Sequence, residues 1–165
     1  MIYISHRGNI SGCNPELENK PHYIDAAIAQ GYDVEIDVWL DNKYGLCLGH
    51  DIPCTPVGLD WLLSRKDSLW IHCKNGDALN ALLCQKANGL PLLNCFYHTD
   101  EAYVLTSGGQ VWCYPGLPAL RMNTSVNVCP EWKKDTCYDP DTYIGFAGAM
   151  IVTGKHHTCP PEVKT

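Results

Sequence analysis

The sequence predicts an α/β fold: a small or abbreviated (β/α)8 barrel of the TIM type, with reduced outer helices in its C-terminal half. Short β-rich segments alternate with helical segments, and strand–helix–strand units predict a parallel sheet. About eight strand-like segments suit such a barrel, but 165 residues are fewer than the roughly 200 of a complete one. Some outer helices must therefore be absent or reduced to turns. We expect a single domain over residues 1–165.

The elements follow from hydrophobic periodicity and from turn residues. Residues 2–5 form the first predicted strand, a helix covers 23–30 and ends at Gly31, and the second strand covers 33–40. No repeat or charged linker divides the chain. The remaining predictions are strands at 46–49, 69–74, 92–98, 102–106, 110–114, 125–129 and 149–153 and helices at 59–65 and 77–87.

Composition and charge exclude several classes of protein. The chain is 45% hydrophobic and 18% charged, which is ordinary for a globular protein. Its net charge of −6 disfavours general nucleic-acid binding and attraction to anionic membranes. No apolar run approaches the roughly 20 residues of a membrane span, so no stable membrane insertion is expected. The first residues lack the pattern of a signal peptide, so we expect a cytoplasmic protein.

Ten cysteines are spread along the chain without a C-x-x-C pair, which disfavours a structural zinc site. Several lie inside apolar segments, where a free thiol is a small buried hydrophobic group. We therefore expect mostly reduced cysteines. Cys129 and Cys137 could pair in an oxidising compartment.

Two carboxylates on the second strand are the best candidate metal ligands. Glu35 and Asp37 alternate with apolar residues, so both point to one face with backbones roughly 6–7 Å apart. Hard oxygen donors favour Mg²⁺ or Ca²⁺. The alternative is an exposed strand face with two solvated acids. A buried parallel strand would not hold such charges unpaired, which favours the metal.

Two histidines lie at predicted strand or hairpin ends. His6 follows the first strand, and His50 ends the hairpin after the second, beside Asp51. Two imidazoles that titrate near neutrality can share the roles of general base and general acid. A lone histidine is usually structural, but the paired acids favour catalysis.

Further residues are candidates for binding substrate. Arg7 offers a bidentate fork for phosphate, and Lys74 ends the third main strand, where His72 shares its face. Trp112 could form an apolar wall for an alcohol moiety, although a core position is equally reasonable. His98, Asp100 and Glu131 also end predicted strands.

The order and spacing of these motifs resemble a known family. His6-Arg7-Gly8, Glu18-Asn19, Glu35-x-Asp37 and Gly49-His50-Asp51 are similar to the front half of glycerophosphodiester phosphodiesterases, which are phospholipase-C-like TIM-barrel enzymes. The similarity is close over residues 3–51 and weak over 71–74. It implies that His6 and His50 are the acid–base pair, that Glu35 and Asp37 bind a divalent cation, and that Arg7 and Lys74 contact phosphate. Asn19 is predicted to bind substrate with them.

The third main strand departs from the family pattern. Where the family usually has a glutamate as third metal ligand, this chain has His72. Imidazole ligates Mn²⁺ or Zn²⁺ but suits Mg²⁺ and Ca²⁺ poorly. His72 is therefore predicted as a metal ligand that makes Mn²⁺ an option, with binding through water or contact with substrate as alternatives.

The resemblance implies a metal-dependent phosphodiesterase that hydrolyses a glycerophosphodiester to an alcohol and a phosphomonoester. The first alternative is a lyase-type phospholipase D that acts on lysophospholipid or sphingomyelin and releases a cyclic phosphate. The second is an inactive barrel that only binds a phosphorylated ligand. The residue at position 72 is its only support.

Overall fold

The computed structural model describes residues 2–114, 125–128, 145–146 and 149–152, and Glu131, Cys129 and Cys137 lie outside them. All strands in this part belong to one mixed sheet. The helices are α1 (Pro21–Ala29), α2 (Leu59–Leu63), α3 (Gly76–Cys84) and the 3₁₀ turn η1 (Gln85–Asn88). The strands are β1 (Ile2–His6), β2 (Asp33–Asp41), β3 (Gly45–Leu48), β4 (Thr55–Pro56), β5 (Leu69–Cys73), β6 (Cys95–Phe96), β7 (Tyr103–Leu105), β8 (Val111–Cys113), β9 (Ser125–Asn127), β10 (Gly145–Phe146) and β11 (Ala149–Val152).

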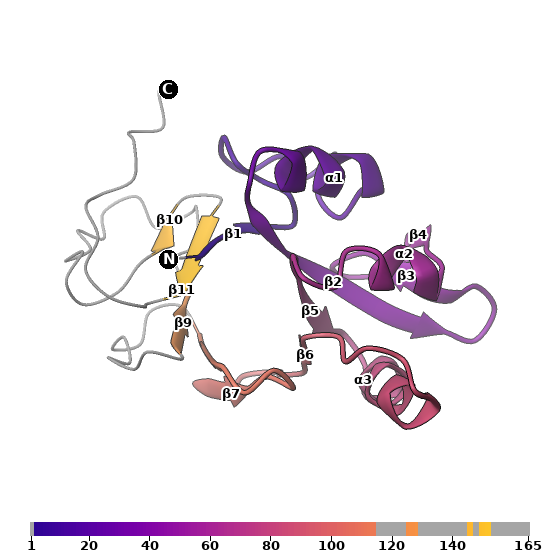
Figure 1. The fold of residues 1–165 in the computed structure, drawn as a ribbon. Coiled ribbons are helices and arrows are strands. Elements are labelled where there is room, and N and C mark those ends of the chain that lie inside the picture. Colours follow the sequence, from indigo (N-terminus) through magenta and orange to yellow (C-terminus); the bar gives the residue numbers. More distant parts are fainter. Residues whose placement is uncertain (1, 115–124, 129–144, 147–148, 153–165) are drawn as a thin grey trace.

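The N-terminal half has the parallel pairing that the sequence predicts. Strand β2 lies between β1 and β5 and is parallel to both, and β6 continues the parallel set beyond β5. The three α-helices lie outside these strands (Figure 1). One core fills the space between the helices and the sheet. Alternate residues of β2 (Val34, Ile36 and Val38) point into it and are fully buried.

The predicted (β/α)8 barrel is wrong. The described residues contain only three short α-helices, all before residue 85, and the rest is predominantly β-structure. Antiparallel pairs join β7 to β8 and β11 to β1 and β9, so the sheet is mixed. The sheet curves strongly (Figure 1), but in the described part no strand pairing joins β6 to β7 or β8, and no closed barrel forms.

The physical reason for the open edge lies around β6. The apolar residues 92–98 predict a full strand, but only two of them pair with β5. The hydroxyl of Ser107, in the turn between β7 and β8, accepts from the Cys95 N–H at 2.9 Å and donates to the Leu93 carbonyl at 2.7 Å. A side chain thus satisfies backbone groups that a neighbouring strand would otherwise pair.

The other face of the curved sheet carries a second, smaller core. It consists of Ile4, Trp70, Phe96, Trp112 and Val126. These residues come from five different strands, and Ile4, Trp70 and Phe96 lie two positions before His6, His72 and His98, so they underlie the site described below. No helix in the described ranges is long and apolar enough to cross a membrane. The single-domain assignment for the whole chain stays a prediction.

Candidate active site

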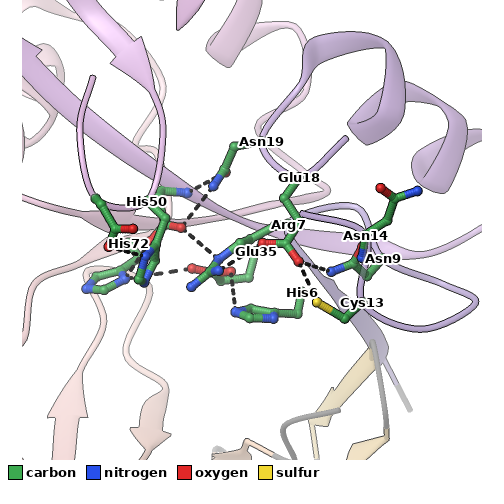
Figure 2. A network of polar contacts seen from close by, with 12 residues as sticks. His6, Arg7, Asn9, Cys13, Asn14, Glu18, Asn19, Glu35, His50 and His72 are labelled. Atoms are coloured by element: carbon green, nitrogen blue, oxygen red, sulfur yellow. Dashed lines mark hydrogen bonds and ion pairs between the residues drawn. The ribbon is translucent and has the colours of Figure 1, made fainter. Parts of the chain in front are cut away.

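Strand register brings the predicted site residues together. His6 on β1 is the cross-strand partner of Glu35 on β2, and Asp37 is the partner of His72 on β5. Because strand side chains alternate, all four point to the concave face of the sheet. Figure 2 shows His6, Glu35 and His72 converging, with Arg7 among them. The prediction that Glu35 and Asp37 share one face is confirmed.

Glu35, Asp37 and His72 form a group that could hold a metal ion. One ligand atom from each lies within 4.8 Å of the others. His72 Nδ1 is 3.0 Å from Asp37 Oδ1 and 3.8 Å from Glu35 Oε1. Glu35 is 3% exposed and Asp37 is fully buried. Glu35 Oε2 is buried and accepts no hydrogen bond from the residues described, so this oxygen fits a cation.

Asp37 is the centre of the polar network. Its Oδ2 lies 2.9 Å from Arg7 Nε and accepts a 2.9 Å hydrogen bond from Asn19 Nδ2. Its Oδ1 lies 3.4 Å from Lys74 Nζ. The Asp37 backbone N–H donates to Asn19 Oδ1 at 2.9 Å. Asn19 therefore orients Asp37, and a direct contact with substrate stays a prediction.

The pKa values of Asp37 and Glu35 are shifted in opposite directions. Burial alone would raise the pKa of Asp37, but the hydrogen bond with His72 and the positive charges of Arg7 and Lys74 lower it below its usual range. Burial and the nearby Asp37 charge raise the pKa of Glu35, and His6, Arg7 and His72 offset only part of this rise. Asp37 is thus held ionised, whereas Glu35 gains most from an added positive charge.

Arg7 links this group to a third carboxylate, that of Glu18. Its Nη1 donates to Glu18 Oε2 at 2.9 Å, while Glu18 Oε1 accepts from Asn9 Nδ2 at 2.8 Å. Arg7 and Asn19 both have a φ of 56°, and the Asn19 N–H donates to the Arg7 carbonyl. Such backbone is uncommon outside glycine and clusters at functional sites. Sequence reasoning missed the role of Asn9, for which the local sequence carries no signal.

His50 reaches the site from the loop after β3. Its Nδ1 lies 2.7 Å from Asp51 Oδ1, and its side chain is 44% exposed. In the view of Figure 2, His6 lies beside Glu35, whereas His50 lies on the side of His72. Burial, together with the charges of Arg7 and Lys74, lowers the pKa of His50 below 6.5. This shift favours the neutral form of His50.

Gly49 positions His50. It has a φ of 150°, its N–H donates to the Asp37 carbonyl, and its own carbonyl accepts from Trp39 Nε1 at 2.7 Å. A Cβ at this position would collide with the carbonyl oxygen of Ile52.

Gly49→Ala should destabilise the protein by about 1–3 kcal/mol, because the loop must shift to remove this collision. Denaturant unfolding measures the change. Gly31→Ala is the control, since its φ is also positive but nothing lies within 4 Å of its added Cβ. An equal decrease in the free energy of unfolding of the two variants would show that the collision is unimportant.

The site opens into a cavity of about 390 Å³, which the buried Asp37 does not line. Its polar side carries His6, Arg7, Glu35, His50, His72 and Lys74. On the aromatic side, the His98 ring stacks on His72 with centroids 4.3 Å apart, and Tyr97 and Tyr114 are partly exposed. Trp112 lines the cavity but is 5% exposed and packs on Phe96, so both of its predicted roles have support. Asp100 is exposed and does not line the cavity.

The seven cysteines in the described part are free thiols. Comparison with known proteins does not assign a family, because no family model, curated protein or solved structure matches the chain. The geometry of the site therefore carries the functional argument.

Proposed function

We propose that the protein is a metal-dependent phosphodiesterase similar to the glycerophosphodiester phosphodiesterases, acting on a small glycerophosphodiester. One observation carries this proposal: a buried group suited to a cation shares a single cavity with two histidines, an arginine and a lysine. Such a site offers charge neutralisation for a phosphate and proton transfer at the attacking oxygen and at the leaving ester oxygen. Its motifs also have the order and spacing of that family.

The residues divide into a ligand set and a phosphate clamp. Glu35, Asp37 and His72 would hold the divalent ion. The two carboxylate ligands favour Mg²⁺ or Ca²⁺, whereas the imidazole ligand favours Mn²⁺. When bound, the ion neutralises phosphate oxygens and lowers the pKa of a coordinated hydroxyl. Lys74 faces the cavity as a phosphate contact. Arg7 has Nη2 to offer, since Nε and Nη1 face Asp37 and Glu18.

Two histidines supply the proton transfers. The lowered pKa of His50 favours the neutral form, which is the form that a general base needs. It would take the proton from the attacking water, whose oxygen bonds to phosphorus as the bond to the leaving alkoxide breaks. His6, whose Nε2 lies 4.0 Å from Glu35 Oε2, would in its protonated form then protonate the leaving alkoxide.

The pH dependence of turnover tests the assignment of His50. Since the base must be neutral and its pKa is lowered, kcat/KM should fall only below pH 6.5 as the pH decreases. The charge of Asp51 raises this pKa, so Asp51→Asn should move the acidic limb to still lower pH. An acidic limb centred above pH 6.5, or one that Asp51→Asn does not move, would contradict the assignment.

A lyase-type phospholipase D is the second candidate, because the cavity mouth is partly aromatic. Tyr97 and Tyr114 are 39% and 44% exposed there and could contact an acyl chain or a headgroup. In that reaction the neighbouring hydroxyl of the substrate attacks, and a cyclic phosphate is released. The same histidines would serve both reactions.

A substrate panel distinguishes these candidates. Wild-type protein is incubated with bis(p-nitrophenyl) phosphate, glycerophosphocholine and lysophosphatidylcholine, with chelator or with Mg²⁺, Ca²⁺ or Mn²⁺. We expect hydrolysis of the first two, loss of activity with chelator, and recovery with a divalent ion. Cyclic phosphate from the lipid alone would favour the lyase. No turnover of any substrate with any ion would contradict both.

A further inference from the structure

We propose that the cation site selects a divalent first-row transition metal ion, with Mn²⁺ as the reference case, over Mg²⁺ and Ca²⁺. The inference rests on the cation that the proposed function requires, but it concerns binding and is tested without turnover. Its basis is the donor set: two carboxylates and one imidazole nitrogen. Oxygen-only sites suit Mg²⁺ and Ca²⁺, whereas imidazole favours transition metals.

His72 is placed as a direct ligand. Neighbouring donors of an octahedral ion lie roughly 3 Å apart when each is about 2.1 Å from the ion. His72 Nδ1 is 3.0 Å from Asp37 Oδ1, and 3.8 Å from Glu35 Oε1. The separations therefore need only small adjustments for all three atoms to share one ion. A bound ion would take the place of the hydrogen bond between His72 Nδ1 and Asp37 Oδ1.

The plane of the His72 ring is fixed by its neighbours. Phe96 lies parallel to it, with centroids 5.3 Å apart and an interplanar angle of 3°. The His98 ring is also parallel to it and lies closer, with centroids 4.3 Å apart and an interplanar angle of 5°. The other ring nitrogen, Nε2, is buried without a hydrogen-bond partner among the described residues. Nδ1 is thus the nitrogen presented to the carboxylates, and little side-chain entropy remains to be lost on binding.

The charges around the group weaken its affinity for hard ions. Arg7 and Lys74 both contact Asp37, so positive charge already neutralises part of the charge of this ligand. Mg²⁺ and Ca²⁺ depend on carboxylate charge for affinity. The bond from a transition metal to a neutral imidazole does not depend on that charge to the same degree. Net charge and donor type therefore favour the same class of ion.

The test measures metal binding to the full-length protein after the metal has been removed. Equilibrium dialysis with elemental analysis gives the Kd values for Mn²⁺, Mg²⁺ and Ca²⁺, and pulsed EPR of bound Mn²⁺ detects the coupling of a ligating ¹⁴N. We expect wild-type protein to bind Mn²⁺ at least about tenfold more tightly than Mg²⁺ or Ca²⁺ and to show this coupling.

Two variants assign the nitrogen. His72→Glu should remove the coupling and lower the preference for Mn²⁺ over Mg²⁺ at least about tenfold, and His72→Gln serves if the added acid prevents folding. His98→Phe keeps the ring stack but removes the other imidazole nearby, so the coupling should remain.

Equal wild-type affinity for Mn²⁺ and Mg²⁺, absence of nitrogen coupling, or coupling that survives in the His72 variants would each overturn the inference. Failure of the proposed function would look different: Mn²⁺ selectivity would persist while no phosphodiester is hydrolysed.

Discussion

Replacing His50 or His6 with alanine is expected to lower kcat/KM for phosphodiester hydrolysis at least about 10²-fold while the fold is retained. Each variant removes one of two proton-transfer groups in the cavity. His50 lies on an exposed loop, and its ion-pair partner among the described residues is the exposed Asp51, so removing its side chain should cost little stability. His6 lies 4.0 Å from Glu35 and is the more sensitive of the two positions.

Steady-state kinetics with bis(p-nitrophenyl) phosphate measures the effect, and circular dichroism checks the fold. His22→Ala is the matched control, because this histidine is exposed on α1 and does not line the cavity. It should retain wild-type activity. Wild-type turnover in both cavity variants would refute acid–base catalysis by these histidines.

Asp37→Ala is expected to destabilise the metal-free protein by about 3–5 kcal/mol. Asp37 is fully buried and is contacted by Arg7, Lys74, His72 and the amide of Asn19. Removing its carboxylate takes this partner from Lys74 and leaves Arg7 with Glu18, in a poorly solvated site. The variant should also lose the bound cation, since one of the three ligands is gone.

Urea unfolding followed by tryptophan fluorescence measures this loss. Asp67→Ala is the control for removing an acid from an ion pair, because the Asp67 side chain is 86% exposed and pairs with Lys66 on the surface. It should change the free energy of unfolding by at most about 1 kcal/mol. A similar small change for Asp37→Ala would contradict its central place in the network.

The sequence predicts the site better than the fold, for a physical reason. Alternation in residues 33–40 places Glu35 and Asp37 on one face, and two-residue periodicity is a local property that tertiary context rarely changes once the other face is buried. His72 and Lys74 follow by the same rule, and both line the cavity. Strand ends in a parallel set meet at one edge, which explains why distant motifs converge.

The fold class depends on non-local choices that this periodicity does not encode. Residues 92–98 have the apolar character of a strand. The Ser107 hydroxyl nevertheless bonds the Cys95 N–H and the Leu93 carbonyl, in place of the backbone groups of a neighbouring strand. The orientation of β7, β8 and β11 depends similarly on which strands become neighbours. The role of Asn19 in orienting Asp37 also depends on a backbone conformation, the φ of 56° at Asn19, that the sequence does not specify.

The central claim is that this cavity cleaves a phosphodiester with a bound cation. ³¹P NMR of glycerophosphocholine incubated with the full-length protein tests it most directly, because the starting diester and each phosphorus-containing product have separate signals. We predict that the diester signal decays to a phosphomonoester with Mn²⁺ present and persists with EDTA or with Glu35→Gln. An unchanged diester signal with every divalent ion tried, or equal decay with EDTA, would contradict the claim.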